Sequence, residues 1–185
     1  MAFEKERILK ELYKKINEKE VDDEIIPTLD LINSIPETYS VSSCAGRICL
    51  IGFFDKYKKN ESKFVFKSHK EVSVSDIWSK LKCSKLRNIW FNMEGVILHI
   101  KTKRLEEAFR ILEIARKAGF KHSGAYETKY GIMIEIRDAE RITFPIKVDN
   151  ELMLNKKSFS KIISIANEKL MKTKNKLKNF NKLLC

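Results

Sequence analysis

Helices are predicted in five stretches of the chain. Apolar side chains spaced three or four positions apart form one face over residues 3–19, 22–34, 104–118 and 158–185. A shorter helix is expected over residues 74–81. Ser73 immediately before it, with Asp76 three residues later, matches a capping box. Asp22 and Asp23 should begin the second helix, and Gly119 should end the fourth.

Shorter apolar runs predict strands. They cover residues 48–54, 64–66, 88–95, 96–101, 120–126, 132–136 and 141–144. A polar turn over residues 55–62 would join the first two strands as a hairpin, and Glu94-Gly95 would turn between the next two. The small polar residues ahead of Ile48 predict a loop.

Short connections between strands favour an α+β fold with a mixed or mostly antiparallel sheet. The order of elements indicates a duplicated strand–helix–strand unit, and a barrel-like closure of the sheet is left open by the pattern. The length of 185 residues favours one domain. Within it we expect N-terminal helices over residues 1–36, a core of sheet and helices over 37–148, and a basic C-terminal helix over 158–185.

Positive charge is concentrated near the C-terminus. The chain has a net charge of +12, and residues 156–185 hold nine lysines and one acid, which places eight of those charges there. Such a local field favours a polyanion, and nucleic acid is the commonest one in the cytosol; a solvated helix face is the alternative. Among the aromatic residues that lie close to basic ones, Trp78 is the ring we expect to stack on an RNA base, with packing in the core as the alternative.

The four cysteines have no CxxC spacing. This argues against a zinc site and against a disulfide framework, so we expect no metal and a reducing, cytoplasmic environment. The N-terminus lacks the apolar segment of a signal peptide. No apolar run is long enough to cross a bilayer, so we expect no membrane partner.

A compact group of reactive residue types lies at Ser42-Ser43-Cys44-Ala45-Gly46-Arg47. It can bring backbone N–H groups, short polar side chains and one cation against a bound group, although turn geometry alone would also explain it. The chain has no GxGxxG, P-loop, HExxH or GxSxG motif. A doubly wound methyltransferase or dehydrogenase site is therefore not indicated.

Three histidines fall near the ends of predicted strands, at His69, His99 and His122. A histidine can accept a proton near neutral pH. His69 follows Ser68 just beyond a strand and is the better catalytic candidate, whereas His99 lies between apolar neighbours and could be a satisfied core residue. A nucleophile pair of Cys44 with His69 is a further alternative.

The signature at residues 42–47 resembles that of the tRNA wybutosine-synthesis methyltransferase family, and five other segments extend the resemblance in the same order. They are Ile25–Asn33, Phe66–His69, Gly95–Ile100, Ala118–Gly124 and Ile165–Leu170. The resemblance spans roughly residues 20–185. Asp138 lies where we expect a serine, so no role is assigned to it.

The resemblance implies an S-adenosyl-L-methionine-dependent methyltransferase that is not of the Rossmann type. Its substrate would be the N-4 nitrogen of a wyosine-type guanosine next to the anticodon, so that the partner is the anticodon loop of tRNA-Phe. His69 would orient or deprotonate that nitrogen. The residues expected to bind cofactor or substrate are Ser42, Ser43, Cys44, Gly46, Arg47, Ser68, Trp78, His99, Ser123 and Gly124.

Two other functions compete with this one. A non-catalytic RNA-binding module would explain the charge and the aromatic residues, but would make the signature incidental. A thiol-dependent enzyme would use Cys44 as its nucleophile. Binding of S-adenosylmethionine separates the first from a methyltransferase, and the activity of a Cys44→Ser protein tests the second.

Overall fold

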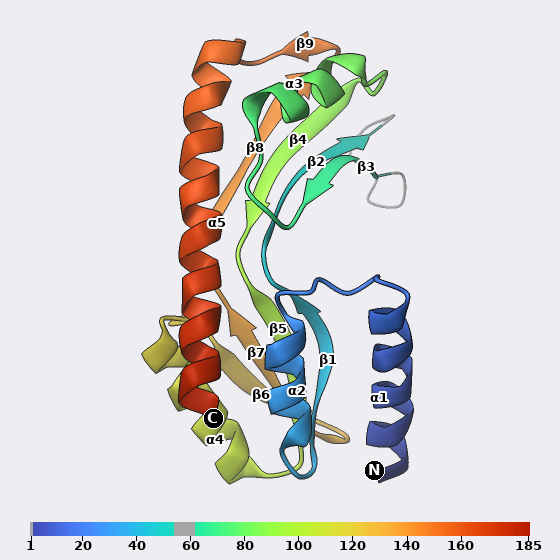
Figure 1. Cartoon of the computed structure of the whole chain (residues 1–185), viewed down its shortest axis with the longest axis vertical. Helices are drawn as coiled ribbons and strands as arrows, with labels where there is room; N and C mark the ends of the chain where they lie inside the picture. Colours follow the sequence, from blue (N-terminus) through green and yellow to red (C-terminus); the bar gives the residue numbers. More distant parts are fainter. Residues whose placement is uncertain (1, 54–61) are drawn as a thin grey trace. The chain divides into compact units, whose positions relative to one another are not determined.

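The computed structural model describes residues 2–53 and 62–185 (Figure 1). It divides into two compact units. Unit 1 comprises Met1–Ala45, Val96–Ala139 and Thr173–Cys185, and unit 2 comprises Gly46–Gly95 and Glu140–Lys172. The described strands form one open antiparallel sheet in each unit, so the α+β prediction is confirmed and the barrel-like alternative is not realised.

Unit 1 has a four-stranded sheet in the order β1-β5-β7-β6. Its strands are β1 (Thr38–Cys44), β5 (Ile97–Thr102), β6 (Gly124–Thr128) and β7 (Gly131–Arg137), and its helices are α1 (Ala2–Asn17), α2 (Ile26–Ser34) and α4 (Leu105–Ala118). Helix α4 packs on β5, β6 and β7, whereas α1 and α2 pack against β1. The two edge strands are therefore β1 and β6.

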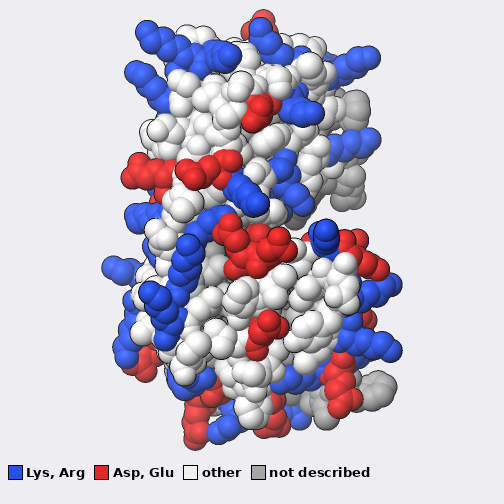
Figure 2. All heavy atoms as spheres, viewed as in Figure 1, with Lys and Arg blue, Asp and Glu red and all other residues white. Residues whose placement is uncertain are grey.

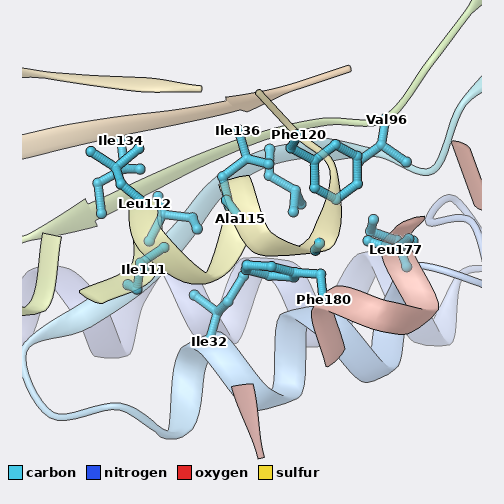
Figure 3. Close-up of a cluster of buried hydrophobic side chains, with 14 of the residues drawn as sticks. Ile32, Val96, Ile111, Leu112, Ala115, Phe120, Ile134, Ile136, Leu177 and Phe180 are labelled. Carbon is cyan, nitrogen blue, oxygen red and sulfur yellow. The ribbon is translucent and has the colours of Figure 1, made fainter. Parts of the chain in front are cut away.

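The core of unit 1 lies between its sheet and α4. Figure 3 shows Ile134 and Ile136 of β7 above the apolar side of α4, with Phe180 on the other side of that helix. Phe180 makes an edge-on contact with Phe120, with ring centroids 6.2 Å apart. The last turns of α5 (Lys156–Leu184) thus contribute to this core. The helix itself was predicted from the apolar seam over residues 158–185.

Unit 2 has a five-stranded sheet in the order β3-β2-β4-β8-β9. Its elements are β2 (Arg47–Phe53), β3 (Lys63–Ser68), α3 (Val74–Cys83), β4 (Asn88–Glu94), β8 (Arg141–Val148), β9 (Glu151–Leu152) and the first part of α5. Phe91 and Phe159 meet edge to face at its centre, with centroids 5.5 Å apart. Ile163 and Leu170 of α5 are buried in the same core.

Several local predictions are confirmed. The five predicted helices are present among the described residues. Ser73 accepts a hydrogen bond from the backbone N–H of Asp76 at 3.1 Å, as a capping residue should. Gly119 ends α4 with φ of 107°, a conformation that glycine adopts readily. Strands β2 and β3 pair antiparallel, while the turn predicted over 55–62 lies outside the described residues except for Ser62.

The predicted start of the second helix is wrong. Helix α2 begins at Ile26, and its N-cap residue, Ile25, makes no capping bond through its side chain. Asp22 instead accepts a hydrogen bond from the N–H of Glu24 at 3.3 Å, in a turn ahead of the helix. Pro27 stands in the first turn, where a missing N–H costs nothing.

The predicted turn between residues 88–95 and 96–101 does not form a hairpin. Strand β4 pairs with β2 and β8 in unit 2, and β5 pairs with β1 and β7 in unit 1. Both strands are thus flanked on both edges by other partners. The apolar pattern identifies each strand but says nothing about which strand lies beside it.

The loop predicted ahead of Ile48 is also wrong in part. Residues 38–44 form β1, so Ser42, Ser43 and Cys44 lie on a strand. Pairing with β5 satisfies the backbone of these small polar residues and overrides their turn propensity. The extended segment predicted at 120–126 begins later, at Gly124.

The lysines of α5 are not all on solvent-facing sides. Lys169 and Lys172 both pair with Glu140, whereas Lys174, which is buried, pairs with Glu24. Lys176 pairs with Asp138 at 2.7 Å. On the face that Figure 2 shows, basic side chains are interspersed with acidic ones. None of the described helices is long and apolar enough to span a membrane.

Candidate functional site

A bulge in β1 decides where the first signature serine points. Ser40 is opposite Ile100, but the pairing shifts at Val41, so that Ser42 is opposite His99. Directly paired residues share a face of the sheet, and a bulge moves the following residues to the other face. Ser40 is therefore buried on the core side, whereas Ser42 is exposed on the side that carries His99.

Ser42, His99 and Glu135 form a hydrogen-bonded chain across three strands. The Ser42 Oγ lies 2.8 Å from His99 Nδ1, and His99 Nε2 lies 3.2 Å from a Glu135 carboxylate oxygen. An ionised carboxylate only accepts hydrogen bonds, so the neutral ring carries its proton on Nε2. His99 Nδ1 then accepts from the Ser42 hydroxyl, whose oxygen lone pairs remain to accept a further proton.

The chain lies on the sheet face opposite α4. Leu98 and Ile100 flank His99 in β5 and are fully buried toward α4, which places His99 on the other face. The side chains of His99 and Glu135 are 28% and 34% exposed, so ligands can reach them. The interpretation of His99 as a core residue is therefore wrong. Glu135 was not a predicted site residue, although an acid in the apolar run Ile132–Ile136 is a signal that could have identified it.

The same face of the sheet holds a fixed cation two residues further along β5. Lys101 pairs with Glu4 of α1 at 3.2 Å and lies 5.3 Å from the ring centroid of Tyr130. Burial alone would lower the pKa of Lys101, but Glu4 and the Tyr39 hydroxyl outweigh it and raise the pKa. Burial in turn raises the pKa of Tyr39. Lys101 thus stays charged at any physiological pH.

In unit 2, Gly46 and His69 are joined directly. Gly46 has φ of 91°, which is strained for residues with a side chain. Its carbonyl oxygen lies 2.9 Å from His69 Nδ1. Because a carbonyl can only accept, Nδ1 carries the proton in the neutral ring, and Nε2 is the basic nitrogen of His69.

Arg47 follows Gly46 and is held by an acid on the neighbouring strand. It is opposite Glu94 in the β2–β4 pair, and its Nε lies 2.7 Å from a Glu94 oxygen. The guanidinium also lies over the ring of Phe64, 5.4 Å from its centroid. The Arg47 side chain is 30% exposed, so part of it can be reached by an anion. No pattern in the sequence would have identified Glu94 as a site residue.

The segment after β3 is fixed by contacts that the sequence did not reveal. The Ser68 hydroxyl donates to the carbonyl of Lys70 and accepts from its N–H, which makes a local turn next to His69. Asn167 of α5 holds both backbone groups of Val72, each at 3.0 Å. This double contact ties the segment that carries His69 to the helix.

Three other predicted site residues have surroundings that bear on their expected roles. Trp78 packs on Phe159 in the core of unit 2, with centroids 5.7 Å apart. Ser123 is buried and its hydroxyl serves two backbone groups, donating to Phe120 at 2.8 Å and accepting from the Arg137 N–H at 3.3 Å. Gly124 borders open space, since a methyl group added there would contact no atom within 4 Å.

The structure thus brings the predicted residues together in two sets. Ser42 and His99 meet in unit 1, where Glu135 completes the chain. Gly46 and His69 meet in unit 2, next to the Arg47–Glu94 pair. Cys44, at the end of β1, is half-buried.

Comparison with known proteins identifies the family. A model of a methyltransferase family, TYW3, matches residues 3–185. The chain belongs to the TYW3 methyltransferase family. The resemblance drawn from the six sequence segments is therefore confirmed, and an enzyme is established over a non-catalytic RNA-binding module. Methyltransferases of this family use S-adenosylmethionine as the methyl donor.

Relatives of this TYW3 methyltransferase come from several archaea. It is 34% identical to a Thermococcus sibiricus protein named tRNA(Phe) 7-((3-amino-3-carboxypropyl)-4-demethylwyosine(37)-N(4))-methyltransferase, over 95% of this chain and 90% of the relative. A Pyrococcus horikoshii protein named for the same activity is 33% identical over 94% of this chain and 89% of its own length.

Solved structures extend the comparison to the fold. A Pyrococcus horikoshii protein superimposes with a TM-score of 0.91 at 31% identity, covering 100% of this chain and 95% of the other. An Aeropyrum pernix protein reaches a TM-score of 0.75 at 27% identity, covering 88% of this chain and 96% of the other. The two-sheet α+β architecture is thus shared by proteins of solved structure.

Proposed function

We propose that this enzyme methylates N-4 of 7-(3-amino-3-carboxypropyl)-4-demethylwyosine at position 37 of tRNA(Phe). The proposal is supported by the activity for which relatives that match nearly the whole chain are named. The net charge of +12 suits an RNA substrate. We also propose a cytoplasmic enzyme, because a tRNA substrate is available there.

The reaction requires that a proton leave the nitrogen. S-adenosylmethionine, when bound, supplies a methyl group on a sulfonium that departs as a neutral thioether. The N-4 atom of a demethyl base carries hydrogen, so forming the N–CH₃ bond must release that hydrogen as a proton. Since the donor brings its own leaving group, the protein has to align the reactants and accept the proton.

The Ser42–His99–Glu135 chain is the observation that carries our assignment of this task. Ser42 Oγ would accept the N-4 proton while it passes its own hydrogen to His99 Nδ1. Glu135 stabilises the resulting imidazolium through its contact with Nε2. The relay needs no rearrangement of the hydrogen bonds already present, which are 2.8 Å and 3.2 Å long.

His69 is the second candidate base, as the sequence predicted. The Gly46 carbonyl holds its ring in the form with Nε2 as the basic nitrogen. Nε2 would then accept the proton directly, without a hydroxyl between base and substrate. Replacing Ser42 distinguishes the two candidate bases, because Ser42→Ala disables the relay but leaves His69 intact.

The remaining residues fit S-adenosylmethionine by their chemistry. Arg47, with a partly exposed guanidinium, would pair with the carboxylate of the methionine moiety or with an RNA phosphate. Ser43 is paired with Leu98 and so faces the α4 side of the sheet, where its half-buried hydroxyl would serve a group bound on that side. Gly124, beside open space, leaves room for a group that approaches the backbone closely. Ser68 and Trp78 are proposed as supporting residues within unit 2, and Cys44 and Ser123 within unit 1.

Methyl transfer to precursor-containing tRNA(Phe) tests the assignment. We expect Ser42→Ala, His99→Gln and Glu135→Gln each to lower kcat roughly 100-fold or more, the usual contribution of general base catalysis. His122→Ala is the matched control, since His122 is an exposed histidine of the same unit, and it should retain full activity.

Each result separates the possibilities. If His69→Ala abolishes turnover while the three relay variants keep it, the base is His69. If all four variants retain wild-type kcat, neither histidine is the base. If Cys44→Ser alone abolishes turnover and S-adenosylmethionine still binds, the thiol-dependent alternative gains support.

Binding of tRNA should depend on salt through the lysines of α5. Five exposed lysines of this helix have no ion-pair partner within the described part of the chain: Lys156, Lys157, Lys161, Lys178 and Lys182. If all five contacted phosphates, a plot of log affinity against log salt would have a slope of about −4 from them. An affinity that does not change with salt would remove α5 from the RNA interface.

A further inference from the structure

A groove on unit 1 lies apart from the Ser42–His99–Glu135 chain, and of the residues given a role above only Gly124 lines it. It runs between α4 and the β6–β7 hairpin, whose elements are labelled in Figure 1, and has a volume of about 760 Å³. Pockets of this size hold small organic ligands or a few linked ring systems. We call it the α4/β6 groove.

One wall of the α4/β6 groove is apolar and open to solvent. Leu105 and Phe109 stand one helical turn apart on α4 and are 59% and 64% exposed. Leu112 continues the same row toward the core. Large apolar side chains that adjoin one another on a surface and line a hollow typically mark a binding site.

The rim of the groove is basic. Lys103, Arg116 and Lys129 line it, against a single acid, Glu127. In the part of the chain that the structure describes, none of the three cations has an ion-pair partner. Three other basic residues on or next to α4, by contrast, are paired with nearby acids: Arg104 with Glu106, Arg110 with Glu107 and Lys117 with Glu113.

The other wall is the edge of the sheet. Strand β6 is the last strand of its sheet and pairs only with β7 among the described strands. An edge strand presents N–H and C=O groups with no ladder partner. These groups can form hydrogen bonds with the polar edge of a flat ring, just as they can with another strand.

We propose that the α4/β6 groove binds an unpaired nucleotide of the tRNA other than the one that is methylated. A nucleotide combines a flat ring with an anion, and the groove combines Phe109 and Leu105 with three cations. The ring would stack on Phe109, with a phosphate held by Arg116, Lys103 or Lys129. The excess of positive charge on the rim favours RNA over a peptide or a second copy of the chain. This inference rests on the tRNA substrate proposed above.

Fluorescence anisotropy with labelled, unmodified tRNA(Phe) transcript tests the groove. Phe109→Ala should raise Kd roughly 5- to 100-fold, the effect of losing one base-stacking ring. Arg116→Gln should raise Kd and make the salt slope shallower by about 1. Met153→Ala is the matched control, because Met153 is an exposed apolar side chain outside both α5 and the groove, at 44% exposure, and it should leave Kd unchanged.

Methylation kinetics distinguish this inference from the proposed function. Both groove variants should raise KM and leave kcat within twofold, since no groove residue belongs to the relay. If both variants bind tRNA as the wild type does, the groove does not bind RNA. RNA binding by the groove is also excluded if Phe109→Ala abolishes a dimer seen in sedimentation while tRNA affinity is unchanged. If the wild type binds tRNA with groove dependence but methylates none, the proposed function fails and the groove stands.

Discussion

Replacing Glu140 by glutamine should destabilise unit 2 in a way that depends on pH. The Glu140 side chain is 10% exposed and contacts Lys169 and Lys172, which follow one another by one turn of α5. Hydrogen bonds from Lys169 and then Lys172 lower the pKa of Glu140 from 4.5 to about 2. The substitution keeps the shape of the side chain but removes the charge.

The pKa shift sets the size of the effect. Each pKa unit is worth about 1.4 kcal/mol, so a shift from 4.5 to about 2 corresponds to roughly 3 kcal/mol. The Lys172 side chain is 61% exposed, and solvent weakens its attraction for Glu140. We therefore expect Glu140→Gln to cost about 1–3 kcal/mol in the free energy of unfolding at neutral pH.

The sign of the pH dependence follows from the direction of the shift. A carboxylate whose pKa is lower in the folded state stabilises fully above its unfolded pKa, and this stabilisation is lost as pH falls through the folded value. The difference between wild type and Glu140→Gln should thus be constant above about pH 5 and vanish as the pH falls to about 2.

Urea unfolding followed by circular dichroism over this pH range measures the difference. Glu151→Gln provides the control, since Glu151 is an exposed acid of the same unit, and its effect should stay within about 0.5 kcal/mol at every pH. A difference of the same size at the two ends of the range would refute the reasoning. So would a Glu140→Gln protein as stable as the wild type at neutral pH.

Three further substitutions have outcomes fixed by local geometry. Gly131→Ala should destabilise by at least about 2 kcal/mol in urea unfolding, because φ is +126° and the new methyl would lie 2.7 Å from the Thr102 carbonyl oxygen. Gly124→Ala in the same hairpin should change stability by less than about 0.5 kcal/mol, so a loss of activity there would report a ligand contact. Asn167→Ala should cost about 1–3 kcal/mol, since it removes both hydrogen bonds to Val72. Melting temperatures that match the wild type would show that the double contact is dispensable.

The sequence predicted helices and individual strands well because their signals are local. The apolar spacing of α4 and the αL glycine at its end are both properties of a few neighbouring residues, and Gly119 has the expected conformation. The neighbours of β4 and β5 are set by strands far along the chain, so adjacency in sequence wrongly indicated a hairpin. The bulge at Val41 depends on pairing with β5 and has no local signal either.

The candidate site was predicted in its parts but not in its connections. Ser42 and His99 were both identified as site residues, yet only the register of β1 against β5 shows that they touch. Glu135 could have been noticed as an acid in an apolar strand. Asn167 could not have been noticed in this way. Its partners are the backbone groups of Val72, and a residue of any type has such groups. The lysines of α5 were expected to be solvated because the sequence does not show the acids that pair with them.

Helix α5 has a consequence for how the chain is made. It supplies Phe159, Ile163 and Leu170 to the core of unit 2, and Leu177 and Phe180 to the core of unit 1. Neither core can therefore close until this helix has been synthesised, although most strands leave the ribosome earlier. The nascent chain must carry two incomplete apolar surfaces through most of its synthesis. We expect ribosome-bound chains that stop before residue 156 to be digested readily by protease, and chains that include α5 to become resistant in a single step.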